Sequence, residues 1–88
     1  MKIVYTNQFI KDFKKIKSQD KDIDKLKTVI NLLFDKEKLD SKYKDHKLTG
    51  KYKQFRDCHI EPDWILIYKT TTDVLTLYRT GSHSELFE

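Results

Sequence analysis

The chain has 88 residues, which is the length of one domain with one modest hydrophobic core. Hydrophobic residues make up 38% and charged residues 36%, and the five Phe, five Tyr and single Trp exclude a disordered composition. The single cysteine excludes an internal disulfide and any site with several thiolates. The apolar runs fall short of the roughly 20 residues of a membrane span, and Lys11 and Asp12 interrupt any secretory signal. We therefore expect one cytoplasmic domain, residues 1–88, that is not attached to a membrane.

The first half of the chain predicts a strand followed by a helical hairpin. Residues 2–6 are rich in β-branched and aromatic side chains, and Thr6 or Asn7 can cap the helix that follows. A second helix is expected from about Asp20 to Lys36. The apolar residues of the two helices recur at helical spacing: Phe9, Ile10, Phe13 and Ile16, then Ile23, Leu26, Val29, Ile30, Leu33 and Phe34. These stripes are typical of helices packed on a sheet.

The second half predicts three strands joined by short turns. The expected strands are residues 52–60, 64–70 and 74–79, with a turn at Pro62 and a break at Gly81. Residues 64–70 are almost all apolar, which indicates a central strand. Short turns between consecutive strands imply antiparallel pairing. The order β-α-α-β-β-β indicates an α+β fold with both helices on one face of the sheet, so the other face must be polar or covered.

The positive charge is concentrated in one segment. Residues 42–59 contain six basic and two acidic residues, which accounts for the whole net charge of +4. The basic residues are Lys42, Lys44, Lys47, Lys51, Lys53 and Arg56. Such a local field attracts polyanions, although a solvated lysine-rich face would have the same composition.

The histidines are the main candidates for chemistry. His46, His59 and His83 lie in three segments that can meet on one sheet, and imidazole both gives and takes a proton near neutral pH. Asp63 could be a base or orient a histidine, and Arg79 could bind phosphate. Structural roles stay open for each of them.

Two aromatic residues and one thiol complete the candidate set. Trp64 and Phe87 could stack on a base, and Trp64 could equally fill the core. Cys58 and His59 are adjacent on a strand and point to opposite faces, so they cannot readily share a metal ion. We therefore expect neither a metal nor a cofactor.

Three motifs carry a family resemblance. They are Tyr43–Gly50 (YKDHKLTG), Phe55–Trp64 (FRDCHIEPDW) and Leu77–Phe87 (LYRTGSHSELF). Together they resemble the YafQ branch of the RelE-like toxins of bacterial toxin–antitoxin systems. The first 41 residues are similar only in pattern.

The resemblance implies a ribosome-dependent mRNA endoribonuclease that is silenced by a cognate antitoxin, often one with a ribbon-helix-helix DNA-binding part. It implies that the functional residues are those at the motif positions: His46, His59, Asp63, Trp64, Arg79, His83 and Phe87. The basic residues Lys44, Lys47, Lys51, Lys53 and Arg56 would hold RNA.

The expected reaction is attack of a ribose 2′-hydroxyl on the neighbouring phosphate. We assign His83 as the acid and either His46 or Asp63 as the base, with His59 orienting or sharing that role and Arg79 supporting the phosphate. Two alternatives stay open: a non-catalytic interaction domain similar to the ParE-like toxins, and a plain RNA-binding module.

Overall fold

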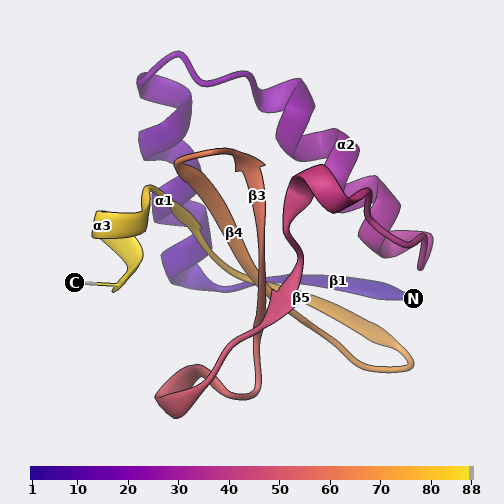
Figure 1. Ribbon diagram of the computed structural model, residues 1–88. Helices are drawn as coiled ribbons and strands as arrows, with labels where there is room; N and C mark the ends of the chain where they lie inside the picture. The colour runs from indigo at the N-terminus through magenta and orange to yellow at the C-terminus, as the bar shows by residue number, and fades with distance from the viewer. Residues whose placement is uncertain (88) are drawn as a thin grey trace.

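The computed structural model describes residues 1–87, which form a five-stranded sheet with two long helices and one short helix (Figure 1). The strands are β1 (Lys2–Tyr5), β2 (His46–Lys47), β3 (Arg56–Glu61), β4 (Trp64–Thr70) and β5 (Val74–Gly81). The helices are α1 (Asn7–Ser18), α2 (Ile23–Phe34) and α3 (His83–Phe87). None of the described helices is long and apolar enough to cross a membrane.

The helical hairpin begins where the sequence predicts it. Thr6 caps α1, because its Oγ1 accepts a hydrogen bond from the Phe9 N–H at 3.0 Å. The same hydroxyl donates to the Tyr78 carbonyl at 2.7 Å, which fastens the start of α1 to β5. Asp22 caps α2 through the Asp24 N–H at 3.1 Å. Both helices are therefore defined by local capping as well as by their apolar faces.

The strand order is β1-β5-β4-β3-β2, with β4 in the centre as its apolar sequence predicts. The pairs β2–β3, β3–β4 and β4–β5 are antiparallel, whereas β1 pairs with β5 in parallel. The sheet is thus mixed, because the helical hairpin carries the chain away from β1 before the antiparallel strands form. The third pair contains a bulge at Tyr78, which lies between Leu77 and Arg79 in the register.

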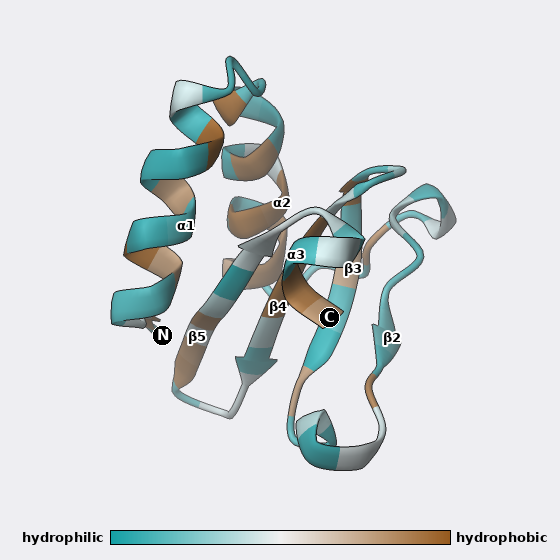
Figure 2. Ribbon diagram, turned by 90° about the vertical axis from the view of Figure 1, so that its left-hand side faces the viewer, coloured by the Kyte–Doolittle hydropathy of each residue, from teal (hydrophilic) through white to brown (hydrophobic). Residues whose placement is uncertain are grey.

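Each face of the sheet has its own apolar cluster. Helices α1 and α2 cover one face, and the buried residues there include Ile16, Leu26 and Leu66. On the opposite face, the short helix α3 places Leu86 against Ile65 and Ile67 of β4. Figure 2 shows α3 separated from α1 and α2 by the strands, with β2 lying beside β3 at the far edge. The second face is therefore only partly covered, and the segment before β3 and helix α3 border its open part.

The segment before β3 differs from its prediction. The expected strand at residues 52–60 begins only at Arg56, because Gly50–Tyr52 forms a 3-10 turn that starts at a positive φ of 66° at Gly50. The two-residue strand β2 was not predicted. It pairs His46 with Asp57, and this pairing positions the first histidine.

Candidate active site

His46 and Asp57 face each other across the β2–β3 pair. The His46 Nδ1 lies 2.8 Å from the Lys44 carbonyl and 3.1 Å from Asp57 Oδ1. Asp57 is only 3% exposed, and burial raises the pKa of its carboxyl group, whereas charge on His46, His59 and His83 would lower it. All three histidines therefore lie within electrostatic reach of one buried carboxylate.

The hydrogen bonds of two histidines define which ring nitrogen carries a proton in the neutral form. A carbonyl oxygen can only accept, so the His46 Nδ1 donates to Lys44 and the His59 Nδ1 donates to Pro62 at 3.1 Å. In each neutral imidazole this leaves the lone pair on Nε2. A ring held in this tautomer is suited to act as a general base.

His83 is the first residue of α3, and it is held through its backbone. Its N–H donates to Asp63 Oδ1 at 3.0 Å, so the turn between β3 and β4 is joined to the start of α3. The His83 ring also packs on Phe87 with a centroid distance of 4.9 Å. Asp63 thus contributes to the site by holding the histidine in place.

These elements enclose a hollow on the partly covered face of the sheet. Its volume is about 350 Å³, and it is lined by His46, Leu48, Thr49, Tyr52, Asp57, His83 and Phe87. Two imidazoles, a buried carboxylate and two aromatic rings thus border one open space. The structure brings together His46, His83 and Phe87 as the sequence predicts, with His59 nearby on the same strand face as Asp57.

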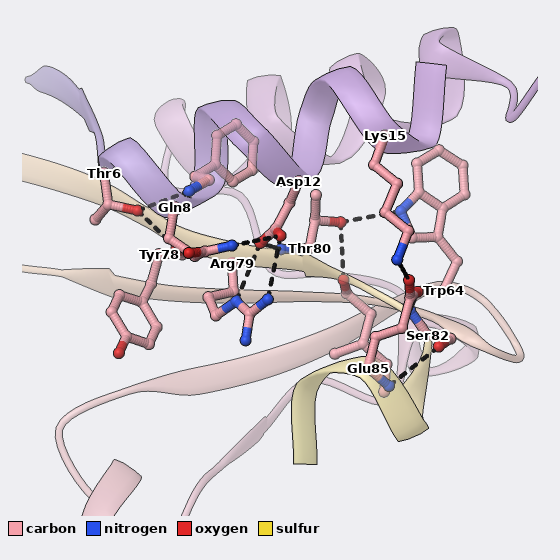
Figure 3. A network of polar contacts seen from close by, with 12 residues as sticks. Thr6, Gln8, Asp12, Lys15, Trp64, Tyr78, Arg79, Thr80, Ser82 and Glu85 are labelled. Atoms are coloured by element: carbon pink, nitrogen blue, oxygen red, sulfur yellow. Dashed lines mark hydrogen bonds and ion pairs between the residues drawn. The ribbon is translucent and has the colours of Figure 1, made fainter. Parts of the chain in front are cut away.

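Arg79 lies outside this hollow, and its guanidinium is paired with a residue that the sequence did not single out. Its Nε and Nη2 donate to the two carboxylate oxygens of Asp12 on α1, each at 3.1 Å (Figure 3). The hydrogen bonds that Arg79 donates to Asp12 raise the pKa of its guanidinium. Arg79 lines a separate hollow of about 380 Å³ together with Gln8, Asp12 and Lys15, so the structure does not bring it together with the histidines.

The prediction that Trp64 stacks on RNA is wrong. Its side chain is 0% exposed in the cluster beneath α1 and α2, and its Nε1 donates to Thr80 Oγ1 at 2.9 Å. The indole therefore fills the core, and no base can reach it. The motif placed an aromatic residue next to Asp63 but did not show which face of β4 it would occupy.

The basic residues are divided between the two sides of the sheet. Arg56 pairs with Asp45 at 3.1 Å and lines a cavity of about 780 Å³ together with Lys44 and Lys36. No histidine lines that cavity. Lys51, by contrast, extends over the ring of Tyr52 at 5.2 Å from its centroid, next to the hollow. Lys47 lies opposite Arg56 in the register, and Lys53 is exposed after the 3-10 turn.

Sequence reasoning missed Asp57 and Tyr52 as residues of the site. Asp57 is two residues before His59, so the alternation of strand side chains would have placed both on one face. No pattern in the sequence predicts where the side chain of Tyr52 lies, because Tyr52 belongs to a 3-10 turn that begins at the positive φ of Gly50. Cys58 is buried on the opposite face, as the same alternation predicts. Among residues 1–87, no group of three or more His, Cys, Asp or Glu side chains is arranged to hold a metal ion.

Comparison with known proteins gives a consistent result. The chain matches the family described as "Bacterial toxin of type II toxin-antitoxin system, YafQ" over residues 1–88. It is 48% identical over 86 residues to the mRNA interferase toxin YafQ of Escherichia coli K12, covering 97% of this chain and 94% of that protein.

Solved structures agree with this match. The crystal structure of YafQ from Escherichia coli BL21(DE3) has a TM-score of 0.95 and 46% identity, covering 98% of this chain and 97% of that one. YafQ in the Escherichia coli DinJ–YafQ complex has a TM-score of 0.91 and 47% identity over the same shares of the two chains.

The helical hairpin on a mixed sheet is the fold that this chain shares with the crystal structure of YafQ, and the family that it matches is one of toxins of type II toxin–antitoxin systems. Within that class, the chain belongs to the YafQ family.

Proposed function

We propose that this protein is an mRNA interferase that cleaves RNA on the ribosome by general acid–base catalysis. One observation carries the proposal: His46, His83 and the buried Asp57 border a single open hollow. The similarity to an mRNA interferase toxin at 48% identity supports the same activity.

The chemistry requires a base at the 2′-oxygen and an acid at the 5′-oxygen. The 2′-oxygen loses its proton and attacks the adjacent phosphorus, and the 5′-oxygen leaves with a proton, so the products are a 2′,3′-cyclic phosphate and a 5′-hydroxyl. His46 is the better base, because its Nδ1 donates to the Lys44 carbonyl and leaves Nε2 free of its proton. Asp63 commits one oxygen to the His83 amide, which favours a holding role. His83 then acts as the acid.

The remaining predicted residues have supporting roles. His59 lies on the same strand face as Asp57 and shares in orienting the substrate or the base. Arg79 follows Tyr78, whose ring centroid lies 6.4 Å from that of Tyr52, and would contribute positive charge near the hollow. Phe87 packs on the His83 ring and offers a surface on which a base can stack.

We also propose a cognate antitoxin as the partner that silences the protein. YafQ of Escherichia coli has been solved in complex with DinJ, and a TM-score of 0.91 relates the two toxin folds. An antitoxin of the ribbon-helix-helix type would join toxin control to DNA binding.

The test is cleavage of ribosome-bound mRNA by the purified protein and by His83→Ala. Loss of the acid should lower the rate by about 10²–10⁴-fold, with the melting temperature close to that of the wild type because His83 is exposed. A substrate with a 2′-deoxy nucleotide at the scissile position should resist cleavage, because it lacks the nucleophile. Wild-type rates for His83→Ala, or cleavage of the deoxy substrate, would reject the mechanism.

Growth arrest separates this function from the alternatives. Expression of the wild type should stop growth, and the His83→Ala change should relieve the arrest. Arrest that persists in the variant would favour a protein that acts by binding alone.

A further inference from the structure

Helix α3 carries His83 but has only five residues. Isolated helices shorter than about 12–15 residues are marginal in water, so contacts with the rest of the protein must hold α3 in place. Leu86 supplies one apolar anchor against Ile65 and Ile67. Phe87 supplies a second one, against the ring of Tyr52 at a centroid distance of 6.0 Å. Apolar contacts are non-directional, so polar contacts at the start of the helix contribute to its orientation, among them the His83 N–H bond to Asp63.

Glu85 provides these polar contacts from within the helix. Its Oε1 accepts the Ser82 N–H at 2.9 Å, and the Glu85 N–H donates to Ser82 Oγ at 3.2 Å, which forms a reciprocal capping box. A Cβ atom at Gly81 would lie 3.2 Å from the same Oε1, so a glycine leaves the space that this carboxylate needs.

The other oxygen of Glu85 reaches a different element. Its Oε2 forms an ion pair with the Lys15 Nζ of α1 at the edge of the sheet (Figure 3). The contacts with Lys15 and Ser82 together lower the pKa of Glu85 to about 2, so the carboxylate is charged throughout the neutral range. One side chain thus joins the start of α3 to the helix on the opposite face of the sheet.

The part of α1 that holds Lys15 is itself fixed. Asp12 lies three residues earlier, on the same side of the helix, and accepts hydrogen bonds from Arg79 and from the Thr80 N–H at 3.2 Å. α1 is therefore bound to β5 immediately before the segment that leads into α3. The connection thus runs from β5 to Asp12 on α1, along α1 to Lys15, and from Lys15 to Glu85 in the first turn of α3.

We infer that Lys15 and Glu85 are positioning residues, which set the orientation of α3 and thereby hold His83 at the hollow. The inference rests on the proposed RNA cleavage, in which His83 is the acid. Neither side chain lines the hollow, so both act through the helix. Misplacement of a catalytic group by about 1 Å can cost up to 10²-fold in rate.

The experiment compares Lys15→Met with a matched control, Lys25→Met. Lys25 forms an ion pair with Glu61 at 2.8 Å and is 52% exposed, against 58% for Lys15, but its pair joins α2 to β3 and does not touch α3. We expect Lys15→Met to lower kcat about three- to tenfold with KM unchanged, and Lys25→Met to cleave like the wild type. Equal kcat values for the two variants would overturn the inference.

A double-mutant cycle measures how much the Lys15–Glu85 ion pair itself contributes to kcat. Glu85→Gln retains an oxygen for the capping box but loses the charge, so it should reduce kcat as Lys15→Met does. Because both changes break one interaction, the double variant should be no slower than either single variant. Lys15→Arg should keep the ion pair and restore kcat. Rate losses that multiply in the double variant would overturn the inference.

Amide hydrogen exchange gives a readout that does not depend on activity. In Lys15→Met, the amides of His83 and Glu85 should exchange faster, whereas those of β4 should keep their wild-type rates. If the wild type cleaves no RNA, the proposed function fails, and the exchange rates still decide whether the pair holds α3. Unchanged exchange at His83 and Glu85 would show that it does not.

Discussion

Asp57 is a buried carboxylate whose Oδ1 has no hydrogen-bond donor of good geometry among the described residues, although the His46 Nδ1 is 3.1 Å away. Burial raises the pKa of Asp57 above its ordinary value of 3.8, because a charged carboxylate is costly where water is excluded. The charged form of Asp57 therefore reduces the stability of the fold. A protein that keeps such a group gains something other than stability from it, and the surrounding imidazoles indicate catalysis.

Asp57→Asn should therefore raise the stability of the folded protein and lower its rate of RNA cleavage. The neutral amide removes the buried charge, and we expect a gain of about 1 kcal/mol at neutral pH, or about 4–8 °C in melting temperature. As the pH falls through the raised pKa of Asp57, its carboxyl becomes neutral and the difference between the proteins should shrink. Thermal melts at pH 7 and below pH 3.8 measure this, with cleavage assays in parallel. A variant that melts lower at pH 7 would contradict the prediction.

The sequence motifs predicted some residues of the site correctly and misplaced Trp64. The motifs led to His46, His83 and Phe87, which meet at one hollow. They did not separate Trp64 from these residues, because a motif gives the order of residues and not the strand face that each one occupies. The side-chain alternation that does give the face was hidden in β4, where almost every residue is apolar.

At the scale of elements, α3 is the segment whose position depends most on charge. The folded pKa of Glu85 is about 2, against an ordinary value of 4.5, so the contacts of its carboxylate stabilise the folded state fully above pH 4.5. This stabilisation declines as the pH falls from 4.5 and is lost near pH 2. The rest of the sheet does not depend on this group.

We therefore predict that acid releases α3 before it unfolds the sheet. Between pH 4.5 and about 2, the backbone amide resonances of residues 83–87 should shift while those of β4 stay constant. Glu85→Gln, which has no charge to lose, should show no such local transition. A single transition shared by all amides would mean that α3 and the sheet melt as one unit.

The elements themselves were predictable to different degrees. Helical periodicity and the Thr6 cap gave the hairpin, and the turn at Pro62 gave the β3–β4 pair. The parallel pairing of β1 was not predictable, because its partner β5 lies near the other end of the chain. The strand β2 was not predictable, because two residues are too few to show a pattern. β2 holds His46, so the least predictable strand contributes directly to the site.

For the whole molecule, the division of positive charge between the two sides of the sheet matters more than the net charge. Lys51 lies next to the hollow, whereas Arg56 is paired with Asp45 beside the cavity on the α2 side. A polyanion bound at the hollow should therefore contact Lys51 and not Arg56.

Salt titration of RNA binding tests this division. With His83→Ala as an inactive background, Lys51→Ala should reduce the slope of log K against log salt by about 0.7, the value for one phosphate contact on single-stranded RNA. Arg56→Ala should leave the slope unchanged. Equal slopes for the two variants would show that the backbone of the RNA extends over both sides.

The short length of β1 leaves the outer edge of β5 without a strand partner beyond Leu77, which is where a strand from another molecule would add. Asp12 occupies that position by accepting the Thr80 N–H. An incoming strand would have to displace this carboxylate and leave the Arg79 guanidinium without its partner. The contact that fastens α1 to β5 thus also guards the protein against edge-to-edge aggregation.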